Sequence, residues 1–495
     1  MSLVDNVPLT EDFKSTNFTA VISDLHLCEA HITDPTNPLW KKFKTKQFFF
    51  DDIFQDFLED ISRDAKIKSD ELRIDPSIEL VLNGDIFDFD SVTKLPDSPP
   101  YKMSWLERNR GLHPEEPKSV FKIRCILEDH DVFVEALREF IIAGNKLVIV
   151  VGNHDVELLY PGVQSEILKF LNLSMEEKTR VRFTPWFYIS NEDTLIEHGH
   201  QYDPYCICQN PIHPMVRQFN RVELRLPFGN LASRYMINGM GFFNPHVDAN
   251  FVMSAKEYLN FFVKYMLRAQ PLLLVTWFWS ATLTFIKAFG DSLLPALKDP
   301  LTTEDRISKI AKLSNATPRM VRELNEIKVH PAASNPFKLA RELWIDRAFL
   351  ILVAFLVFFQ IFGFIKLIWD ISIFWIFIPL ALFVPFFMFY TNTFKSSVAS
   401  YKEPNEKLIS LSSIITKTNR IIYGHTHIIR HEFIEMVEHL NPGTWSTAFL
   451  DVECTKPYSK RMYCWIEQTE SGIRKSSLRS AEKMDDSKEN VFSKS

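Results

Sequence analysis

In the stretch KLVIVVGNHD, residues 146–155, a run of mostly β-branched apolar residues is followed at once by a glycine, an asparagine, a histidine and an aspartate. Such a run is typical of a buried strand, and Gly152 and Asn153 accept the backbone angles that a turn requires. Taken alone, the stretch is an ordinary junction between a strand and a turn. Its meaning depends on whether the chain repeats the arrangement.

Four further apolar runs end in the same way: FTAVISDLHL (18–27), IELVLNGDIFDFD (78–90), DTLIEHGHQYD (193–203) and RIIYGHTH (420–427). Each predicts a strand with polar groups just past its carboxyl end, the edge of an open α/β sheet where ligands bind. Helical patterns occupy 45–64 and 119–144 between these strands. We therefore predict an α/β fold for this part of the chain.

The polar groups that follow the strands belong to metal-binding types. Carboxylate, imidazole and one amide oxygen suit a pair of divalent cations such as Mn, Fe or Zn, and Asp85 is the natural bridge between them. Two such cations clamp a phosphoryl group and lower the pKa of a bound water, so that hydroxide can attack phosphorus in line. Each motif alone is more often a plain turn, but together they favour a metal site. The candidates are Asp24, His26, Asp85, Asn153, His154, His198, His425 and His427.

The ordered set SDLHL, NGDIFD, GNHD, HGH and YGHTH resembles the motifs of the calcineurin-like metallophosphoesterase superfamily over residues 18–205 and 418–466. The resemblance implies two packed mixed β-sheets flanked by helices, and a metal-dependent phosphoric ester hydrolase with two divalent metal ions, Mn favoured. Matched position by position, it assigns one ion to Asp24, His26, Asp85 and His427. It assigns the other to Asp85, Asn153, His198 and His425.

The same resemblance makes His154 the catalytic histidine, which stabilises the phosphoryl group or protonates the leaving oxygen. Asp155 would orient this imidazole, and Asp88 matches a supporting position. The role suits the chemistry, because an imidazole near its neutral pKa can act as an acid and a carboxylate fixes its tautomer. Gly152 would let the chain turn sharply beneath Asn153 and His154.

More than two hundred residues separate His198 from His425, far more than an ordinary connection. We expect a helical insertion over 206–417. Within it, the segments 349–365 and 371–390 are nearly uncharged and close to membrane-spanning length. They favour a membrane hairpin near 349–390 over two buried core helices.

A third apolar run, 271–286, is shorter than the other two. Because His198 and His425 must meet in one site, the insertion must cross the membrane an even number of times. We therefore expect 271–286 to form an interfacial or re-entrant helix. Basic residues on both flanks of the hairpin predict an active site on the cytosolic face of the membrane. They are Arg341, Arg347, Lys395 and Lys402.

Three arginines, Arg217, Arg221 and Arg225, recur at intervals of four. They would share one face if the stretch 213–235 were helical. A clamp for a headgroup or diphosphate and a solvated face partly neutralised by Glu223 explain them equally well. We keep the three as candidate substrate-binding residues.

Composition narrows the class of partner. A net charge of −6 argues against a general polyanion-binding surface, so nucleic acid is not an expected partner. Six cysteines without a CxxC pair favour a reducing compartment, and the polar start shows no secretory signal. We predict a metallophosphoesterase domain in two parts, 1–205 and 418–468, with the insertion between them and a disordered tail over 469–495.

A metal site at a membrane points to a phosphoester or diphosphate, possibly lipid-linked, as the substrate. The placement of the insertion resembles the lid of the UDP-2,3-diacylglucosamine hydrolases, although those enzymes carry Arg where this chain has His154 and their lid lacks a spanning hairpin. The alternative is a membrane-tethered phosphodiesterase or phosphatase that acts on a soluble nucleotide or phosphoprotein. A metal-bearing scaffold without enzymatic activity is a third hypothesis.

Overall fold

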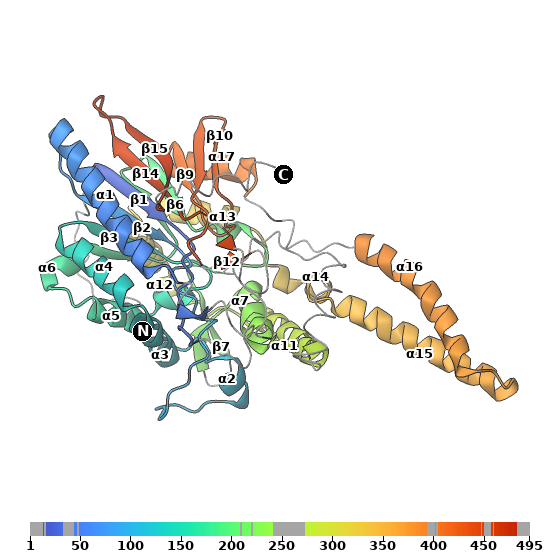
Figure 1. Ribbon diagram of the computed structural model, residues 1–495. Coiled ribbons are helices and arrows are strands. Elements are labelled where there is room, and N and C mark those ends of the chain that lie inside the picture. The colour runs from blue at the N-terminus through green and yellow to red at the C-terminus, as the bar shows by residue number, and fades with distance from the viewer. Residues whose placement is uncertain are drawn as a thin grey trace.

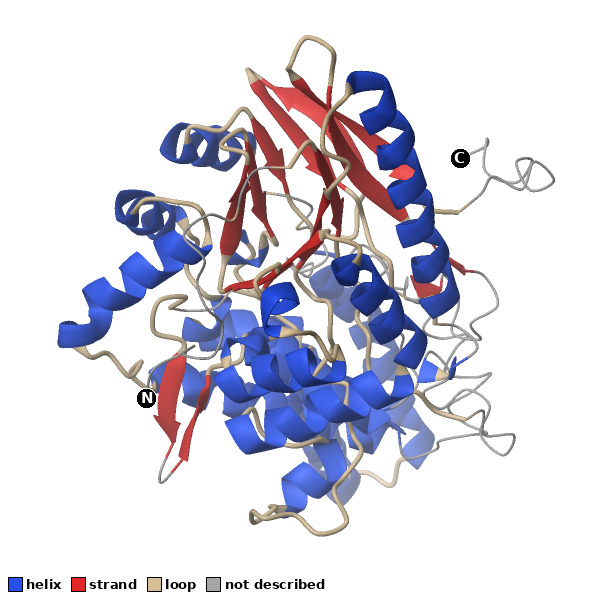
Figure 2. Ribbon diagram, turned by 90° about the vertical axis from the view of Figure 1, so that its left-hand side faces the viewer, coloured by secondary structure: helices blue, strands red, loops and turns tan. Residues whose placement is uncertain are grey.

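Two β-sheets pack face to face at the centre of the fold, with helices on their outer faces (Figure 1, Figure 2). The mixed α/β class and the pair of mixed sheets expected from the sequence are confirmed. In this computed structural model of the chain, the described residues are 13, 16–32, 44–46, 49–207, 210–218, 221–240, 273–393, 401, 404–446, 448–449, 457–458 and 460–482.

The first sheet has the strand order β15-β14-β1-β2-β3-β4. Its four strands from β1 to β4 run parallel, whereas β14 and β15 pair antiparallel. The parallel strands are buried along almost their whole length, as expected of strands covered on both faces. Their bounds are β1 (Phe18–Ile22), β2 (Ile78–Asn83), β3 (Lys146–Val150), β4 (Val181–Thr184), β14 (Met462–Gln468) and β15 (Arg474–Ser480).

The second sheet has the order β10-β11-β9-β6-β5. Strands β6 and β9 lie side by side and parallel although the whole insertion separates them in sequence. The two sheets meet through buried apolar side chains such as Val81 and Val148 from the first and Ile196 and Ile422 from the second. The bounds are β5 (Phe187–Ser190), β6 (Thr194–Glu197), β9 (Arg420–Ile422), β10 (Arg430–Ile434) and β11 (Val437–Asn441).

Helices cover the outer face of each sheet. The helix expected over 119–144 is two helices that meet at His130. The first sheet is covered by α1 (Asp51–Leu72), α3 (Glu116–Asp129), α4 (Asp131–Ile142) and α5 (Pro161–Phe170). The second is covered by α12 (Pro300–Leu313), α13 (Pro318–Ile327) and α17 (Glu406–Thr416).

The insertion begins with a β-hairpin, formed by β7 (Met215–Gln218) and β8 (Arg221–Leu224). The condition under which Arg217, Arg221 and Arg225 would share a helical face is therefore not met. A spacing of four fits the two-residue period of a strand as well as the 3.6-residue period of a helix, so it does not separate the two structures. Buried Val216 and exposed Arg217 show the alternation of the strand.

After this hairpin the insertion is helical. The first three elements pack against one another and against α11. They are α7 (Phe228–Ala232), the π-helix η5 (Ser233–Ile237) and α8 (Asn238–Met240). Further helices of the insertion are α11 (Leu273–Leu293), α14 (Pro336–Glu342), α15 (Ile345–Ile368) and α16 (Phe377–Thr393), besides α12, α13 and α17 on the second sheet.

Helix α11 contains the described part of the apolar run expected to lie in a membrane interface. One face packs on the protein body through the buried Ala281 and Ala288, whereas Phe278, Trp279 and Ile286 on other sides of the helix are exposed. Residues 271 and 272 lie outside the described residues. Because this helix is anchored along one face, it does not stand free as a spanning helix would.

Helices α15 and α16 form an antiparallel pair that projects away from the body (Figure 1). Both are long and apolar enough to cross a membrane, and almost none of their residues are buried in the protein. At the base, Tyr390 Oη donates to Asp346 Oδ2 at 2.9 Å, and Arg347 donates to Asp346 Oδ1 at 3.1 Å. The two ends of the pair therefore lie together beside the body. Lys395 and Lys402 lie outside the described residues.

The chain remains ordered beyond residue 469. Strand β15 pairs along its whole length with β14, from Met462 opposite Ser480 to Gln468 opposite Arg474. The prediction of a disordered tail from residue 469 onward is therefore wrong for the residues of β15. The segment is polar because it lies at the sheet edge, where backbone pairing stabilises the strand. Residues 483–495 lie outside the described residues.

Candidate metal centre

The five motifs converge because their strands end at neighbouring points of the two sheets. Backbone hydrogen bonds join the loops directly: the His26 amide donates to the Asp85 carbonyl at 2.8 Å, and the Gly424 amide donates to the carbonyl of His198 at 3.0 Å. Five residues of these loops adopt positive φ angles, which are uncommon for non-glycine residues. They are Asp24, His26, Asp85, His425 and His427.

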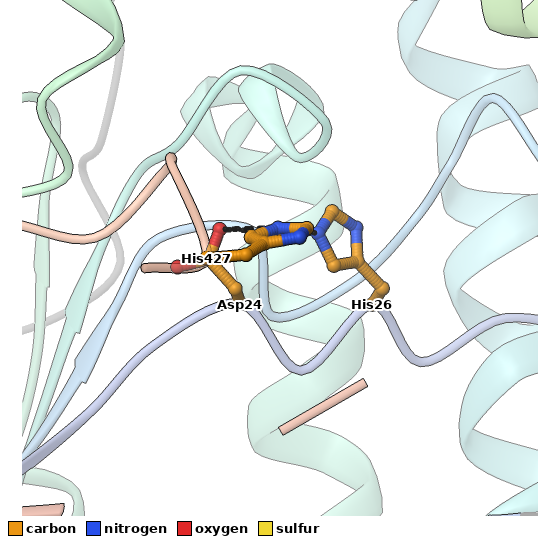
Figure 3. Close-up of side chains that lie close together, drawn as sticks. All are labelled: Asp24, His26 and His427. Carbon is orange, nitrogen blue, oxygen red and sulfur yellow. Dashed lines mark hydrogen bonds and ion pairs between the residues drawn. The ribbon is translucent and has the colours of Figure 1, made fainter. Parts of the chain in front are cut away.

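A first group of possible ligands is formed by Asp24, His26 and His427, whose donor atoms all lie within 4.8 Å of one another (Figure 3). His427 Nε2 lies 3.2 Å from Asp24 Oδ1 and 3.2 Å from His26 Nε2. Two imidazole nitrogens that face each other beside a carboxylate oxygen form a donor set that suits a divalent cation.

A second group consists of Asp85, His198 and His425, again within 4.8 Å. His198 Nδ1 lies 2.9 Å from the Asn83 carbonyl, so it donates there and Nε2 is the nitrogen that faces Asp85. Asp85 Oδ2 lies 3.1 Å from His198 Nε2 and 3.9 Å from His26 Nε2. The Asp85 carboxylate therefore lies between the two groups, as a bridging ligand must.

Asn153 gives the clearest indication that a cation fits here. Its side-chain oxygen Oδ1 is buried and accepts no hydrogen bond from the part of the chain that the structure describes. A buried acceptor without a partner costs about 1–3 kcal/mol, unless something absent from the protein itself fills that place. An amide oxygen is a reasonable ligand, and the loop that carries it contacts Asp85 through the His154 amide at 2.7 Å, so the residues present fit a divalent metal ion.

Electrostatics favour a positive charge in this centre. Burial alone would raise the pKa of Asp85, but His198, His154 and His26 hold it well below its usual range. Burial alone would lower the pKa of His198, but Asp85 and Asp24 raise it to about 9. The carboxylates that hold a proton on His198 would equally stabilise a cation, and metal binding would then displace that proton.

His154 lies at the edge of the centre with its side chain 15% exposed. Its Nδ1 lies 3.4 Å from Asp88 Oδ1. Burial alone would lower the pKa of His154, but Asp85 and Asp88 raise it to about 10. Asp88, assigned only a supporting position from the sequence, is thus the carboxylate paired with this imidazole.

Asp155 does not orient His154, and that expectation is wrong. Asp155 Oδ1 accepts from the Gly152 amide at 2.6 Å and Oδ2 accepts from the Ile86 amide at 2.7 Å. Its buried carboxylate thus points beneath the turn, where it satisfies two backbone donors. Asp155 stabilises the loop that carries Asn153 and His154.

Two residues beside the centre were not predicted from the sequence to belong to the site. Asp203 Oδ2 lies 3.0 Å from His425 Nε2, so it fixes the orientation of that imidazole. Asp203 ends the HGHQYD stretch, and its place in that motif was a usable signal. Asn230, which contacts Asn153, belongs to the insertion and carries no such signal.

Gly152 is required for space. An added Cβ there would lie 2.3 Å from Asp85 Oδ1 and 2.4 Å from the Asp85 amide nitrogen. Its φ is not positive, so the sharp turn expected from glycine's freedom is not the reason for this residue. Gly424 behaves alike, since a Cβ there would lie 2.7 Å from Asp24 Oδ2.

The three candidate substrate-binding arginines lie in or beside the β7–β8 hairpin. Arg217 is exposed. Arg221 lies 3.4 Å from Glu115, and the buried Arg225 donates to the Leu294 carbonyl. The latter two side chains therefore have partners that support packing of the hairpin. Binding of a phosphate by any of the three stays a prediction.

Comparison with known proteins agrees with this geometry. The family model for the calcineurin-like phosphoesterase matches residues 19–226, which include the motifs from Asp24 to His198. No curated protein matches the chain. The matched segment supplies the first sheet's parallel strands and one side of the centre, and β9 adds His425 and His427 from the far side of the insertion. Residues 19–226 therefore belong to a calcineurin-like phosphoesterase domain, and this family indicates a metal-dependent phosphoric ester hydrolase.

Proposed function

We propose that this hydrolase is membrane-associated and cleaves a phosphoester or diphosphate of a lipid-linked substrate at a centre of two divalent cations. The observation that carries the proposal is the coexistence of two features in one chain. Two adjoining donor groups meet at Asp85, and an exposed apolar helical pair projects from the same body. The first supports phosphoester chemistry and the second supports a membrane.

At the centre, one cation would be held by Asp24, His26 and His427 and the other by Asn153, His198 and His425, with Asp85 shared. Mixed oxygen and nitrogen donors suit Mn, Fe or Zn, and we favour Mn. When bound, such cations supply positive charge that neutralises phosphoryl oxygens and makes a water molecule more acidic.

His154 would act on the substrate from the open edge of the centre. Because Nδ1 faces Asp88, Nε2 would be the ring nitrogen that acts on the phosphoester. A proton held there can pass to the leaving oxygen as the phosphorus–oxygen bond breaks, because the carboxylates keep the imidazole protonated. Positive charge bound at Asp85 would weaken that hold and make the proton easier to release.

The membrane part of the proposal concerns the pair α15–α16. Large apolar side chains cover its surface, and its two ends meet at the Asp346–Tyr390 contact. A hairpin inserted from one side keeps the two parts of the catalytic domain, 1–205 and 418–468, together on that side. We propose the cytosolic face, from the basic residues beside the hairpin. We also propose 206–417 as the inserted unit and α11 as an interfacial helix.

The projection of the hairpin away from the body also suits a plain anchor (Figure 1). In that case the enzyme would be a membrane-tethered phosphodiesterase or phosphatase for a soluble nucleotide or phosphoprotein. The two functions differ in where the substrate comes from, because a lipid substrate reaches the centre along the bilayer.

Turnover of matched substrates tests the proposal. Detergent-purified protein with Mn is assayed on a lipid-linked diphosphate in mixed micelles, on bis-p-nitrophenyl phosphate and on a free nucleotide, with His154→Ala as the control for contaminating activity. We expect kcat/KM for the lipid substrate to exceed the soluble values by about tenfold or more, a difference of about 1.4 kcal/mol in transition-state binding. Equal values would favour the tethered enzyme. Absence of any turnover would contradict a phosphoesterase.

A further inference from the structure

The insertion reaches into the metal centre through one side chain, Asn230 of α7. We propose that Asn230 is a positioning residue that sets the orientation of the Asn153 amide, so that the Asn153 oxygen faces the bound cation. This inference rests on the proposed two-cation site. It adds to that site a residue that lies beyond 226, where the match to the phosphoesterase family ends.

The hydrogen bonds of Asn230 define which end of its own amide is nitrogen. The side chain is fully buried, and its Nδ2 donates at 2.6 Å to the Asn153 carbonyl and at 2.6 Å to Asp90 Oδ2. Both partners are acceptors, so only the NH₂ end of Asn230 satisfies them. The opposite end, Oδ1, is therefore an acceptor that faces Asn153.

This acceptor in turn defines the amide of Asn153. Asn153 Nδ2 lies 3.4 Å from Asn230 Oδ1, which places the NH₂ end toward α7. The oxygen end then points the other way, and it is the buried Oδ1 that accepts no hydrogen bond from the described residues. The two ends of an amide have nearly the same shape, so packing alone does not choose between them. A cation requires the oxygen lone pair, and the NH₂ end would repel it.

The neighbourhood of Asn230 is rigid enough for this role. Arg234 donates to the Gly111 carbonyl at 2.7 Å, and Asn238 donates to the Asp90 carbonyl at 2.7 Å. These buried contacts dock the segment 228–240 on the loop that follows β2. The same segment packs on α11, and α11 contacts α14 and α15, so the unit that carries the hairpin also completes the centre.

The test compares two asparagines of this segment. Asn230→Ala removes the contact with Asn153, whereas Asn238→Ala removes a side chain of the same type that donates to the same loop without touching Asn153. Mn binding to each full-length variant is measured by titration with electron paramagnetic resonance, which separates single from paired Mn ions. For Asn230→Ala we expect one of two ions to bind about 10–100-fold more weakly, as for other residues that orient a ligand. Asn238→Ala should bind both ions like the unmodified protein.

A second pair of variants separates orientation from a general loosening of the site. Asn153→Asp offers an oxygen at either end of the side chain, so the direction of the group no longer matters. In that background Asn230→Ala should change Mn affinity by no more than about twofold, because effects do not add when one residue acts through the other. Asn230→Leu, which keeps the side-chain volume, serves if the alanine variant does not fold, with thermal melting as the check on folding.

The outcomes separate this inference from the function on which it rests. If the unmodified protein binds fewer than two Mn ions, the two-cation centre itself is refuted. If it binds two, and Asn230→Ala binds them unchanged, the inference fails alone. It fails equally if Asn238→Ala matches Asn230→Ala, or if the loss persists at full size in the Asn153→Asp background.

Discussion

The metal centre and the α15–α16 hairpin depart from the usual burial pattern in opposite directions. At the centre, Asp24, Asp85 and His198 are no more than 2% exposed. On the hairpin, Phe349 is 65% exposed and Leu352 is 53% exposed. Soluble proteins ordinarily bury the second kind of residue and leave the first in water.

Each departure carries a cost that something outside the chain must offset. Buried carboxylates and an unsatisfied amide oxygen are costly unless a cation binds them. An exposed Leu or Phe forgoes about 1.5–3 kcal/mol of burial, and a large apolar surface of this kind marks an interface with a membrane or a partner. The comparison therefore predicts two separable parts, one completed by metal ions and one by a bilayer. The substitutions below are ordered by their expected effect on turnover of a soluble phosphodiester.

The largest effect is expected for Asp85→Ala. Removal of the shared carboxylate should release bound Mn and return turnover toward the uncatalysed rate, a loss on the order of 10⁶-fold. Elemental analysis after gel filtration measures the Mn content. Membrane association should not change, since the hairpin is untouched. Full metal occupancy in this variant would break the account of the centre.

His154→Ala should come next. It should keep both Mn ions yet lose about 10²–10⁴-fold in kcat, the usual contribution of a general acid. Asp88→Asn should lose less, about 10–100-fold, because Asp88 acts through the imidazole. Steady-state kinetics beside metal analysis separate the two effects. Turnover like that of the unmodified protein in His154→Ala would remove its assigned role.

A loss smaller than that of His154→Ala is expected for Gly152→Ala. The new Cβ would lie 2.3 Å from Asp85 Oδ1, so the loop or the carboxylate must shift. A displacement of about 1 Å in a catalytic group can cost about 100-fold in rate. Added Mn should restore part of the turnover, since weakened binding is its first consequence. Kinetics that match the unmodified enzyme at limiting Mn would show that the site tolerates this shift.

Replacement of 349–390 by a short Gly-Ser linker should have the smallest effect on soluble turnover, within about twofold, because the distant parts behave independently. The same change should move the protein from the membrane pellet to the supernatant when membranes are sedimented by ultracentrifugation. Tight membrane binding by the deletion variant would make α11 the principal anchor. A large loss of soluble turnover would show that the two parts are not separable.

Much of this comparison is readable in the sequence. The five strands end in polar groups, and a strand's carboxyl end fixes where such groups collect, so Asp24, Asp85 and His198 could be brought together without coordinates. The helical hairpin could be predicted equally well, because an uninterrupted apolar segment of this length is visible in the sequence itself. Both depend on signals carried within one short segment.

The features that the sequence did not predict depend on the direction of side chains and on contacts between distant parts of the chain. The role of Asp155 was misjudged because neighbours along the chain do not tell which carboxylate turns back to accept from backbone amides and which one, here Asp88, faces the imidazole. The arginine spacing fitted both helix and strand. Asn230 contacts Asn153 although the two residues are far apart in the sequence, and neither segment contains a pattern that predicts the contact.

Anomalous diffraction from crystals of the Mn-loaded protein tests the central claim most directly. The account predicts two Mn peaks about 3.5–4 Å apart. Asp85 should lie between them, with His26 and His427 beside one ion and His198 and Asn153 beside the other. A single peak, or peaks away from these side chains, would contradict it.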